Sequence, residues 1–346
     1  MKTALMLTLV RPFFAIQVHG SELEPPIVPQ EGELYMPSET ENFSEGLWYI
    51  IKTAIGNISP ELTQAAGVCL GIVGIVLLVA LLKDFSKESQ RTVVLSAVIS
   101  VGVLMLSASN SMIHLAADTV LGLSDYSKLL MPILATALAA QGGTTSSGAL
   151  YTGTALFNTI LVTLLTKLVV PLIYIFICLS IAWAAVGEET LKNIRDFVKW
   201  LMTWSMKIAL YVFSGYMGIT KIVNGAIDAS TLRATKLAIS GIIPVVGKII
   251  SESAESILIS ADIVKNGVGV YGLLAILSVL IGPFIKIGIQ YLLFKLTAAL
   301  CNIFGVKQVS GLIEDFSKAM AAALGMIGIL GAVLMISVVC FMKGVS

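Results

Sequence analysis

The stretch that decides the fold is AAGVCLGIVGIVLLVALL, residues 65–82, in which no side chain is charged. An apolar run of about 18 residues or more is long enough to cross the hydrocarbon core of a bilayer as a helix. Lys83, Lys87 and Arg91 follow this run directly. Because basic residues favour cytoplasmic loops, the sequence predicts a membrane span whose C-terminal end faces the cytoplasm.

The composition of the whole chain extends this prediction. Of the 346 residues, 57% are hydrophobic and 12% are charged, whereas soluble domains carry about 25% charged residues. The 22 basic and 21 acidic residues give a net charge of +1. This balance offers no basic excess with which to bind nucleic acid. We therefore expect a multi-span membrane protein without a nucleic-acid partner.

Further apolar segments predict an all-α polytopic membrane protein with about seven transmembrane helices. Residues 149–186 contain Lys167 and Pro171 and cross the membrane either once, with a kink, or twice. Residues 132–140 form a shorter apolar piece. The expected spans are residues 65–82, 92–117, 149–186, 200–220, 268–285, 287–304 and 319–342.

The N-terminal part of the chain divides in two. Residues 1–20 combine Lys2 with a short apolar stretch and are a candidate signal peptide or uncleaved N-terminal anchor. Between residues 21 and 46 the chain has seven glutamates, four prolines and no basic residue. Because such a composition buries little apolar surface, we expect residues 21–64 to form an acidic, largely disordered segment on the outer side of the membrane.

A region of mixed character, residues 228–266, separates a first membrane-helix group, residues 65–227, from a second group, residues 267–346. The region is too polar to cross a membrane, yet it contains apolar runs. We expect it to form an amphipathic interfacial core of helices that lie at the membrane surface.

The charges of this interfacial core predict one face for partner docking. Lys248, Glu252 and Glu255 recur at spacings of four and three residues and so share one face of a helix. Isoleucines occupy the opposite face. Gly241, Pro244 and Gly247 are expected to break the region into two helices.

Three stretches in and beyond the interfacial core carry a resemblance to a known family. They are RATKLAISGIIPVVG at residues 233–247, SESAES at residues 251–256 and VKNGVGVYGLLA at residues 264–275. Together they resemble the core of the stage III sporulation protein AE family, which consists of polytopic proteins of endospore-forming bacteria. The order of acidic segment, spans, interfacial core and further spans also resembles this family.

The resemblance implies membership of the complex that joins the mother cell to the forespore across two membranes. The partners would be the other stage III A sporulation proteins, which include an ATPase and ring-forming components, and stage II protein Q on the forespore side. The protein would lie in the mother-cell membrane that surrounds the forespore. The family offers no catalytic motif to carry over, and we expect no enzymatic activity.

The residues themselves predict neither a metal site nor a cofactor site. The four cysteines stand far apart, and His19 and His114 are the only histidines of the sequence, so no metal-ligand spacing exists. The segment GVGVYG at residues 267–272 matches the dinucleotide-binding pattern formally. However, no strand precedes it, and no acidic residue follows within about 20 positions.

Polar residues inside the apolar segments are candidates for a polar path or a helix contact. Asn110, His114 and Asp118 recur every four residues on one helix face, with serines nearby. The alternative is that the span ends near His114, because a charge at the bilayer centre costs about 3 kcal/mol. Lys207 and Lys295 lie well within apolar runs, so we expect them to face the protein interior or a hydrated cavity.

Spaced glycines predict close helix packing in the first and the last span. Small residues let two helices approach each other closely inside lipid. We expect these contacts to form within the chain, and contacts in a homo-oligomer are the alternative. The glycines are Gly67, Gly71 and Gly74 in the first span and Gly325, Gly328 and Gly331 in the last.

These observations predict a membrane-embedded subunit of a sporulation transport or secretion channel that links mother cell and forespore and is required for forespore development. Two alternatives stay open. One is a self-sufficient ion-coupled transporter for a small solute. The other is a non-conducting membrane scaffold that anchors the rings of the channel.

Overall fold

The computed structural model describes residues 25–38, 43–85, 90–140, 144–242 and 246–343. Side chains are described for these residues except 83–85, 90, 144–146, 217–242 and 246–266. Every regular element in this part of the chain is a helix, so the predicted all-α class is confirmed. The elements are α2 Gln30–Glu33, α3 Phe43–Gly56, α4 Ile58–Phe85, α5 Gln90–Ala140, α6 Thr144–Leu164, the π-helical η1 Leu165–Val169, α7 Val170–Val186, α8 Glu189–Ile242, α9 Val246–Ile303 and α10 Lys307–Met342.

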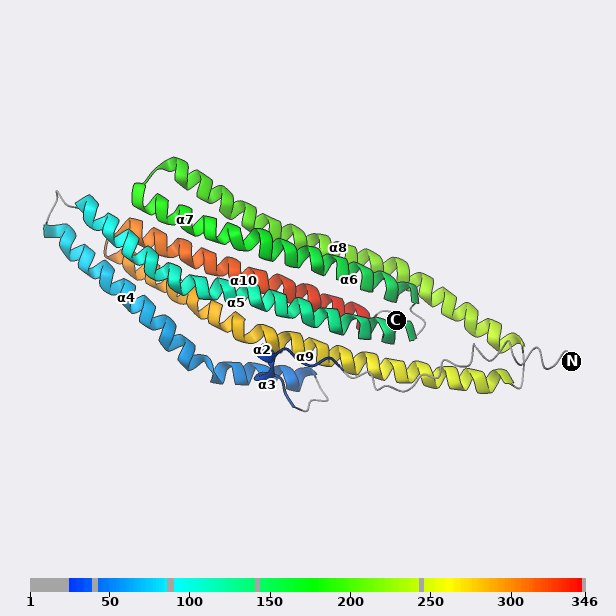
Figure 1. Ribbon diagram of the computed structural model, residues 1–346. Coiled ribbons are helices and arrows are strands. Elements are labelled where there is room, and N and C mark those ends of the chain that lie inside the picture. Colours follow the sequence, from blue (N-terminus) through cyan, green and yellow to red (C-terminus); the bar gives the residue numbers. More distant parts are fainter. Residues whose placement is uncertain (1–24, 39–42, 86–89, 141–143, 243–245, 344–346) are drawn as a thin grey trace.

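Helix α10 is the centre of an elongated bundle (Figure 1). It packs against α5, α6, α7, α8 and α9. Ser310, Ile313, Asp315 and Phe316 project to different sides of α10, yet all four are buried. A helix that is buried on all sides forms the core of its bundle.

Five helices of the described residues are long and apolar enough to cross a membrane, fewer than the seven predicted. They are residues 58–82, 91–140, 147–186, 267–303 and 307–342. The predicted spans 268–285 and 287–304 belong to one helix, α9, and the two predicted pieces 92–117 and 132–140 both belong to α5. Residues 200–220 lie in α8, partly outside the residues with described side chains, and are not among these five.

The difference arises because hydropathy detects polar interruptions but not where the backbone turns. Lys286 interrupts an apolar run without ending helix α9, since a paired lysine is tolerated inside a helix that faces a neighbour. Residues 149–186 likewise form one continuous helical rod, in which the π-helical η1 joins α6 to α7. A π-helical turn accommodates an extra residue without breaking the rod.

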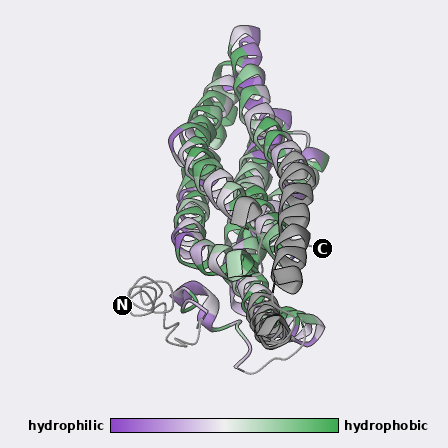
Figure 2. Cartoon of the chain, turned by 90° about the vertical axis from the view of Figure 1, so that its right-hand side faces the viewer, coloured by the Kyte–Doolittle hydropathy of each residue, from purple (hydrophilic) through white to green (hydrophobic). Residues whose placement is uncertain are grey.

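Much of the outer surface of the bundle is apolar. Hydrophobic stretches run along the helices in Figure 2. Large apolar side chains that are at least 60% exposed include Leu70, Leu78, Leu81, Leu156, Ile160 and Leu292. An apolar surface of this extent is typical of contact with lipid.

The expected disorder of residues 21–64 is wrong for much of this segment. Helix α3 packs against α9, with Gly46, Ile50 and Ala54 buried. These residues recur every four positions and form one packing face, whereas the acidic Glu45 is exposed. Composition averages the two faces of such a helix and therefore does not reveal the packing face.

The predicted interfacial core consists of the ends of two long helices. Helix α8 continues to Ile242 and α9 begins at Val246, on either side of the expected break at Pro244. Neither part is a separate short helix, because α8 starts at Glu189 and α9 ends at Ile303. The residues between them, 243–245, lie outside the described residues.

The C-terminal end of α4, the N-terminal end of α5, the α7–α8 turn and the α9–α10 turn lie at the same end of the bundle (Figure 1). The α7–α8 turn uses Gly187 in the left-handed conformation, with φ of 81°. Basic residues, among them Lys192 and Lys307, flank the two turns. By contrast, Gly32 of α2 lies against Ser278, which is 25 residues, or about 38 Å of helix, from the end of α9.

This arrangement supports a topology prediction that single cysteines can test. Cysteines introduced at Lys87 and Glu188 are expected to share one labelling class, and a cysteine at Glu31 is expected to belong to the other. The reason is that about 38 Å of helix exceeds the roughly 30 Å hydrocarbon core. The measurement is labelling of intact cells with a membrane-impermeant thiol reagent, in a background without the native cysteines. Equal labelling at all three positions would contradict the topology.

Candidate functional site

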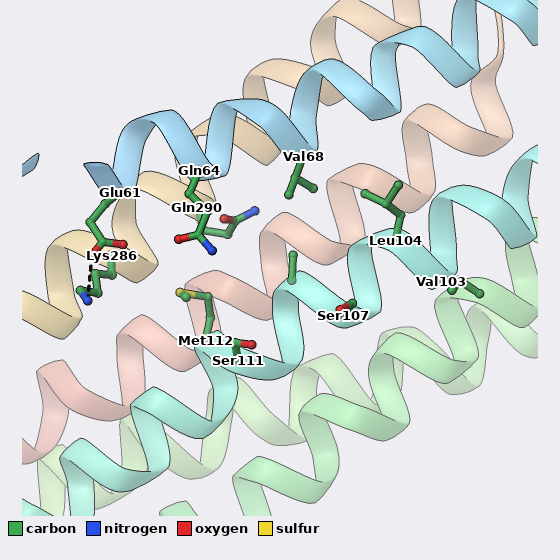
Figure 3. A pocket seen from close by; sticks show the side chains of 12 residues that line it. Glu61, Gln64, Val68, Val103, Leu104, Ser107, Ser111, Met112, Lys286 and Gln290 are labelled. Atoms are coloured by element: carbon green, nitrogen blue, oxygen red, sulfur yellow. Dashed lines mark ion pairs between the residues drawn. The ribbon is translucent and has the colours of Figure 1, made fainter. Parts of the chain in front are cut away.

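A polar pocket lies between α4, α5 and α9, three of the candidate membrane spans (Figure 3). Its volume of about 410 Å³ is in the range of small-ligand sites. Polar side chains at membrane depth mark a functional site by default, because they are costly to place there. The lining residues are Glu61, Gln64, Ala65 and Val68 of α4, Val103, Leu104, Ser107, Ala108, Ser111 and Met112 of α5, and Lys286 and Gln290 of α9.

Helical spacing assembles each wall of this pocket. Glu61, Gln64 and Val68 recur at intervals of three and four residues, so they share one face of α4. Lys286 and Gln290 are one turn apart on α9 in the same way. Figure 3 shows the two glutamines side by side in the middle of the pocket, with the charged residues at one end.

An ion pair closes the charged end of the pocket. The Lys286 Nζ atom lies 2.8 Å from Glu61 Oε1, with the two side chains 39% and 27% exposed. The pair neutralises both charges between two apolar helices, which explains how α9 carries a lysine within a candidate span. The sequence did not indicate this pair, because the two residues lie far apart in the chain.

Gln290 is the most enclosed polar residue of the pocket. The residue is only 5% exposed, and its Nε2 atom has no hydrogen-bond partner among the described residues. An unsatisfied buried donor costs about 1–3 kcal/mol of stability. The wall of the pocket therefore holds a buried amide donor that the described residues leave unsatisfied.

The three residues of the predicted polar stripe of α5 have different surroundings. Asn110 accepts a hydrogen bond of 2.6 Å from the hydroxyl of Tyr174 on α7. His114 and Asp118 are exposed. They continue the helix face of Ser107, which lines the pocket, at spacings of seven and four residues. The stripe thus includes a helix contact at Asn110, whereas a role of His114 and Asp118 in a polar path stays a prediction.

Lys207 and Lys295 do not face the interior of the described bundle, because both side chains are exposed on the surface of the chain. That they face a hydrated cavity stays a prediction. The Lys295 Nζ atom lies 3.5 Å from the hydroxyl of Tyr291 and 5.8 Å from the centre of its ring. The position of a lysine within an apolar run gives its depth along the helix but not the face of the helix on which it lies. In addition, the long lysine side chain lets the ammonium group reach polar surroundings.

The two glycine sets differ in their surroundings. At Gly67, Gly71 and Gly74 of α4, a Cβ atom would meet no described atom within 4 Å, so the expected packing within the chain does not occur there. In α10, a Cβ atom at Gly325 would lie 3.6 Å from Met206 Cε, and one at Gly331 would overlap Leu280. A Cβ atom at Gly328 would meet nothing in the described residues within 4 Å.

A buried cluster of charged residues lies near the α7–α8 turn, and the sequence did not predict it. The Arg195 Nη1 atom of α8 donates a 2.7 Å hydrogen bond to Asp315 Oδ2 of α10, with side-chain exposures of 9% and 3%. The other oxygen of Asp315 accepts from Lys318 at 3.0 Å. The guanidinium of Arg195 also lies 4.3 Å from the centre of the Trp183 ring. This cluster ties the ends of three helices together.

The predicted docking residues Lys248, Glu252 and Glu255 lie in α9, where the side chains are outside the described set. Their role stays a prediction. Helix α9 places them in its N-terminal part, beyond the residues that line the pocket.

The bundle, its apolar outer surface and its candidate spans define a multi-pass α-helical membrane protein. Within this class, the family model for stage III sporulation protein AE matches residues 32–344, and the chain belongs to this family. The resemblance seen in residues 233–275 is thereby confirmed.

One curated relative is the stage III sporulation protein AE of Bacillus subtilis (strain 168). It is 22% identical to this chain over 245 residues, which cover 70% of this chain and 61% of the relative. The matched region thus spans about three fifths of the relative's length. No solved structure matches the chain.

Proposed function

We propose that this protein is a membrane-embedded subunit of a sporulation transport or secretion channel that links the mother cell to the forespore. The observation that carries the proposal is the family match over residues 32–344, since the family name assigns a role in stage III of sporulation. In this proposal, the protein lies in the mother-cell membrane around the forespore and is required for forespore development. It has no enzymatic role.

The partners in this proposal are the other stage III A sporulation proteins, including the ATPase and the ring-forming components, and stage II protein Q. Copurification tests it: the protein, isolated from sporulating cells, is expected to carry the ring-forming components with it. Purification without any of these partners, under conditions that keep the protein folded, would count against the proposal.

The polar pocket favours a second candidate function, transport of a small solute by this protein alone. Polar groups between spans are typical of substrate paths, and the exposed His114 and Asp118 extend the polar face of α5. Reconstitution in liposomes separates the two candidates. Solute uptake by the purified protein supports an independent transporter, whereas a channel subunit is expected to be inactive without its partners.

Charge reversal in the interfacial core tests where partners dock. We expect that Lys248→Glu and Glu252→Lys will each weaken copurification of the partners several-fold while the protein stays in the membrane. The reason is that a docking surface depends on particular charges, whereas lipid contact depends on the apolar face. The double swap is expected to restore part of the copurification, because it re-forms a pair at four-residue spacing.

The matched control is Glu189→Lys, a charge reversal at the N-terminal end of α8, which is the end away from the interfacial core. The Glu189 side chain is 75% exposed. It is expected to leave copurification unchanged. If both reversals at residues 248 and 252 behave like this control, the interfacial core is a lipid-bound region and not a docking surface.

A further inference from the structure

The pocket between α4, α5 and α9 has a balanced pair of opposite charges. Glu61 and Lys286 neutralise each other at 2.8 Å, and the other polar lining residues are uncharged. A ligand with a net charge would bring an uncompensated charge between three apolar helices, which is unfavourable. The pocket therefore suits a ligand that is neutral overall.

The charged hydrogen-bonding groups of the pocket lie on opposite walls. On the α9 side, the ammonium of Lys286 and the unsatisfied Nε2 of Gln290 are donors one helical turn apart. On the α4 side, the carboxylate of Glu61 is an acceptor. A carboxylate of a ligand would fit the α9 wall, and an ammonium group of the ligand would fit the α4 wall. Hydrogen bonds between charged groups are stronger than those between neutral groups.

Apolar side chains occupy the part of the pocket away from these charges. Figure 3 shows Val68 and Leu104 at the end opposite the ion pair. A ligand with an ammonium, a carboxylate and a short apolar side chain would satisfy all three parts of the pocket. The volume of about 410 Å³ accommodates a molecule of this size.

We propose that this pocket binds a free amino acid with an apolar side chain, in its zwitterionic form. The carboxylate of the ligand contacts Lys286 and Gln290, its ammonium contacts Glu61, and its side chain packs against Val68 and Leu104. The inference goes beyond the proposed function and does not depend on it, since the purified protein alone is enough for the test.

The first experiment measures binding of radiolabelled L-leucine to the purified full-length protein in nanodiscs. We expect saturable binding. We also expect 4-methylpentanoate, which lacks the ammonium, and 3-methylbutylamine, which lacks the carboxylate, to compete about tenfold less well or worse than unlabelled leucine. Absence of saturable leucine binding to the folded protein, or competition by either analogue as strong as that by unlabelled leucine, would overturn the proposal.

The second experiment assigns the role of Gln290. Gln290→Met keeps the length of the side chain and removes the amide, so we expect about tenfold weaker leucine binding. The ligand-free variant is expected to unfold at the same temperature as the wild type or higher, because an unsatisfied buried donor has been removed. A merely structural glutamine would instead lower the unfolding temperature and leave binding unchanged.

The matched control is Gln308→Met, at an exposed glutamine of α10. It is expected to keep wild-type affinity for leucine. Equal affinity in Gln290→Met and Gln308→Met would overturn the assignment. Copurification with sporulation partners is measured separately, so a failure of leucine binding is distinguishable from a failure of the proposed channel role.

Discussion

Replacing Asp315 with alanine is expected to destabilise the protein by up to about 3–5 kcal/mol, the largest single effect that the structure predicts. Asp315 is 3% exposed in its side chain, and both of its oxygens accept hydrogen bonds from cations. The substitution leaves Arg195 buried with only the exposed carboxylate of Asp196, 2.8 Å from its Nη2 atom, as an anionic partner. The measurement is the thermal unfolding temperature of the purified protein in detergent.

The control is Asp125→Ala, which removes an ion pair with the same 2.7 Å separation. Asp125 and Lys128 are 73% and 65% exposed, so this variant is expected to lose only about 0–1 kcal/mol. Substituting both Arg195 and Asp315 with leucine should recover much of the lost stability, because apolar residues of similar volume replace buried pairs well. An unfolding temperature of Asp315→Ala equal to that of Asp125→Ala would contradict the assigned role.

The second large effect is expected from Gly331→Leu at the contact between α10 and α9. A Cβ atom at Gly331 overlaps Leu280, and a leucine adds three further carbon atoms to this contact. Overpacking of a buried contact typically costs about 1–3 kcal/mol, and occasionally more. We expect a lower unfolding temperature and a lower abundance of the protein in membranes.

Gly328→Leu is the matched control because it lies in the same helix and gains the same helix propensity, about 0.8–1 kcal/mol relative to glycine. A Cβ atom there meets no described atom within 4 Å. The difference between the two variants thus isolates the packing cost at Gly331. Adding Leu280→Ala to Gly331→Leu should restore part of the stability. If Gly331→Leu unfolds at the temperature of Gly328→Leu, α9 and α10 are not in close contact at this position.

None of the residues that the sequence singled out as site candidates lines the pocket. Ser107 is one of the serines near the predicted polar stripe of α5, and Lys286 lies between two predicted spans. Nothing in the sequence singles out Glu61 or Gln290, because a lone acid near the start of an apolar run and a lone glutamine inside another are common. Only their meeting across two helices forms a site.

The same contrast holds for the lysines of the apolar segments. Hydropathy treats Lys286, Lys207 and Lys295 alike, as cations inside apolar runs. In the structure, Lys286 is paired with Glu61, whereas the other two are exposed. The face on which a side chain lies depends on which neighbour covers that face, and this information is not local in the chain.

The sequence by itself determined the helical membrane class and the family, because hydrophobic length, helical periodicity and a distinctive run of residues are properties of short segments. Only the tertiary structure decided how many apolar segments join into one helix and which polar groups meet. Contacts between segments far apart in the chain decide three features: the continuity of α9 through Lys286, the burial of Arg195 against Asp315 and the buried, unsatisfied donor of Gln290. In such contacts, the cost of removing a polar or charged group from water is offset by the interaction with its partner. The two groups meet only once the helices are packed.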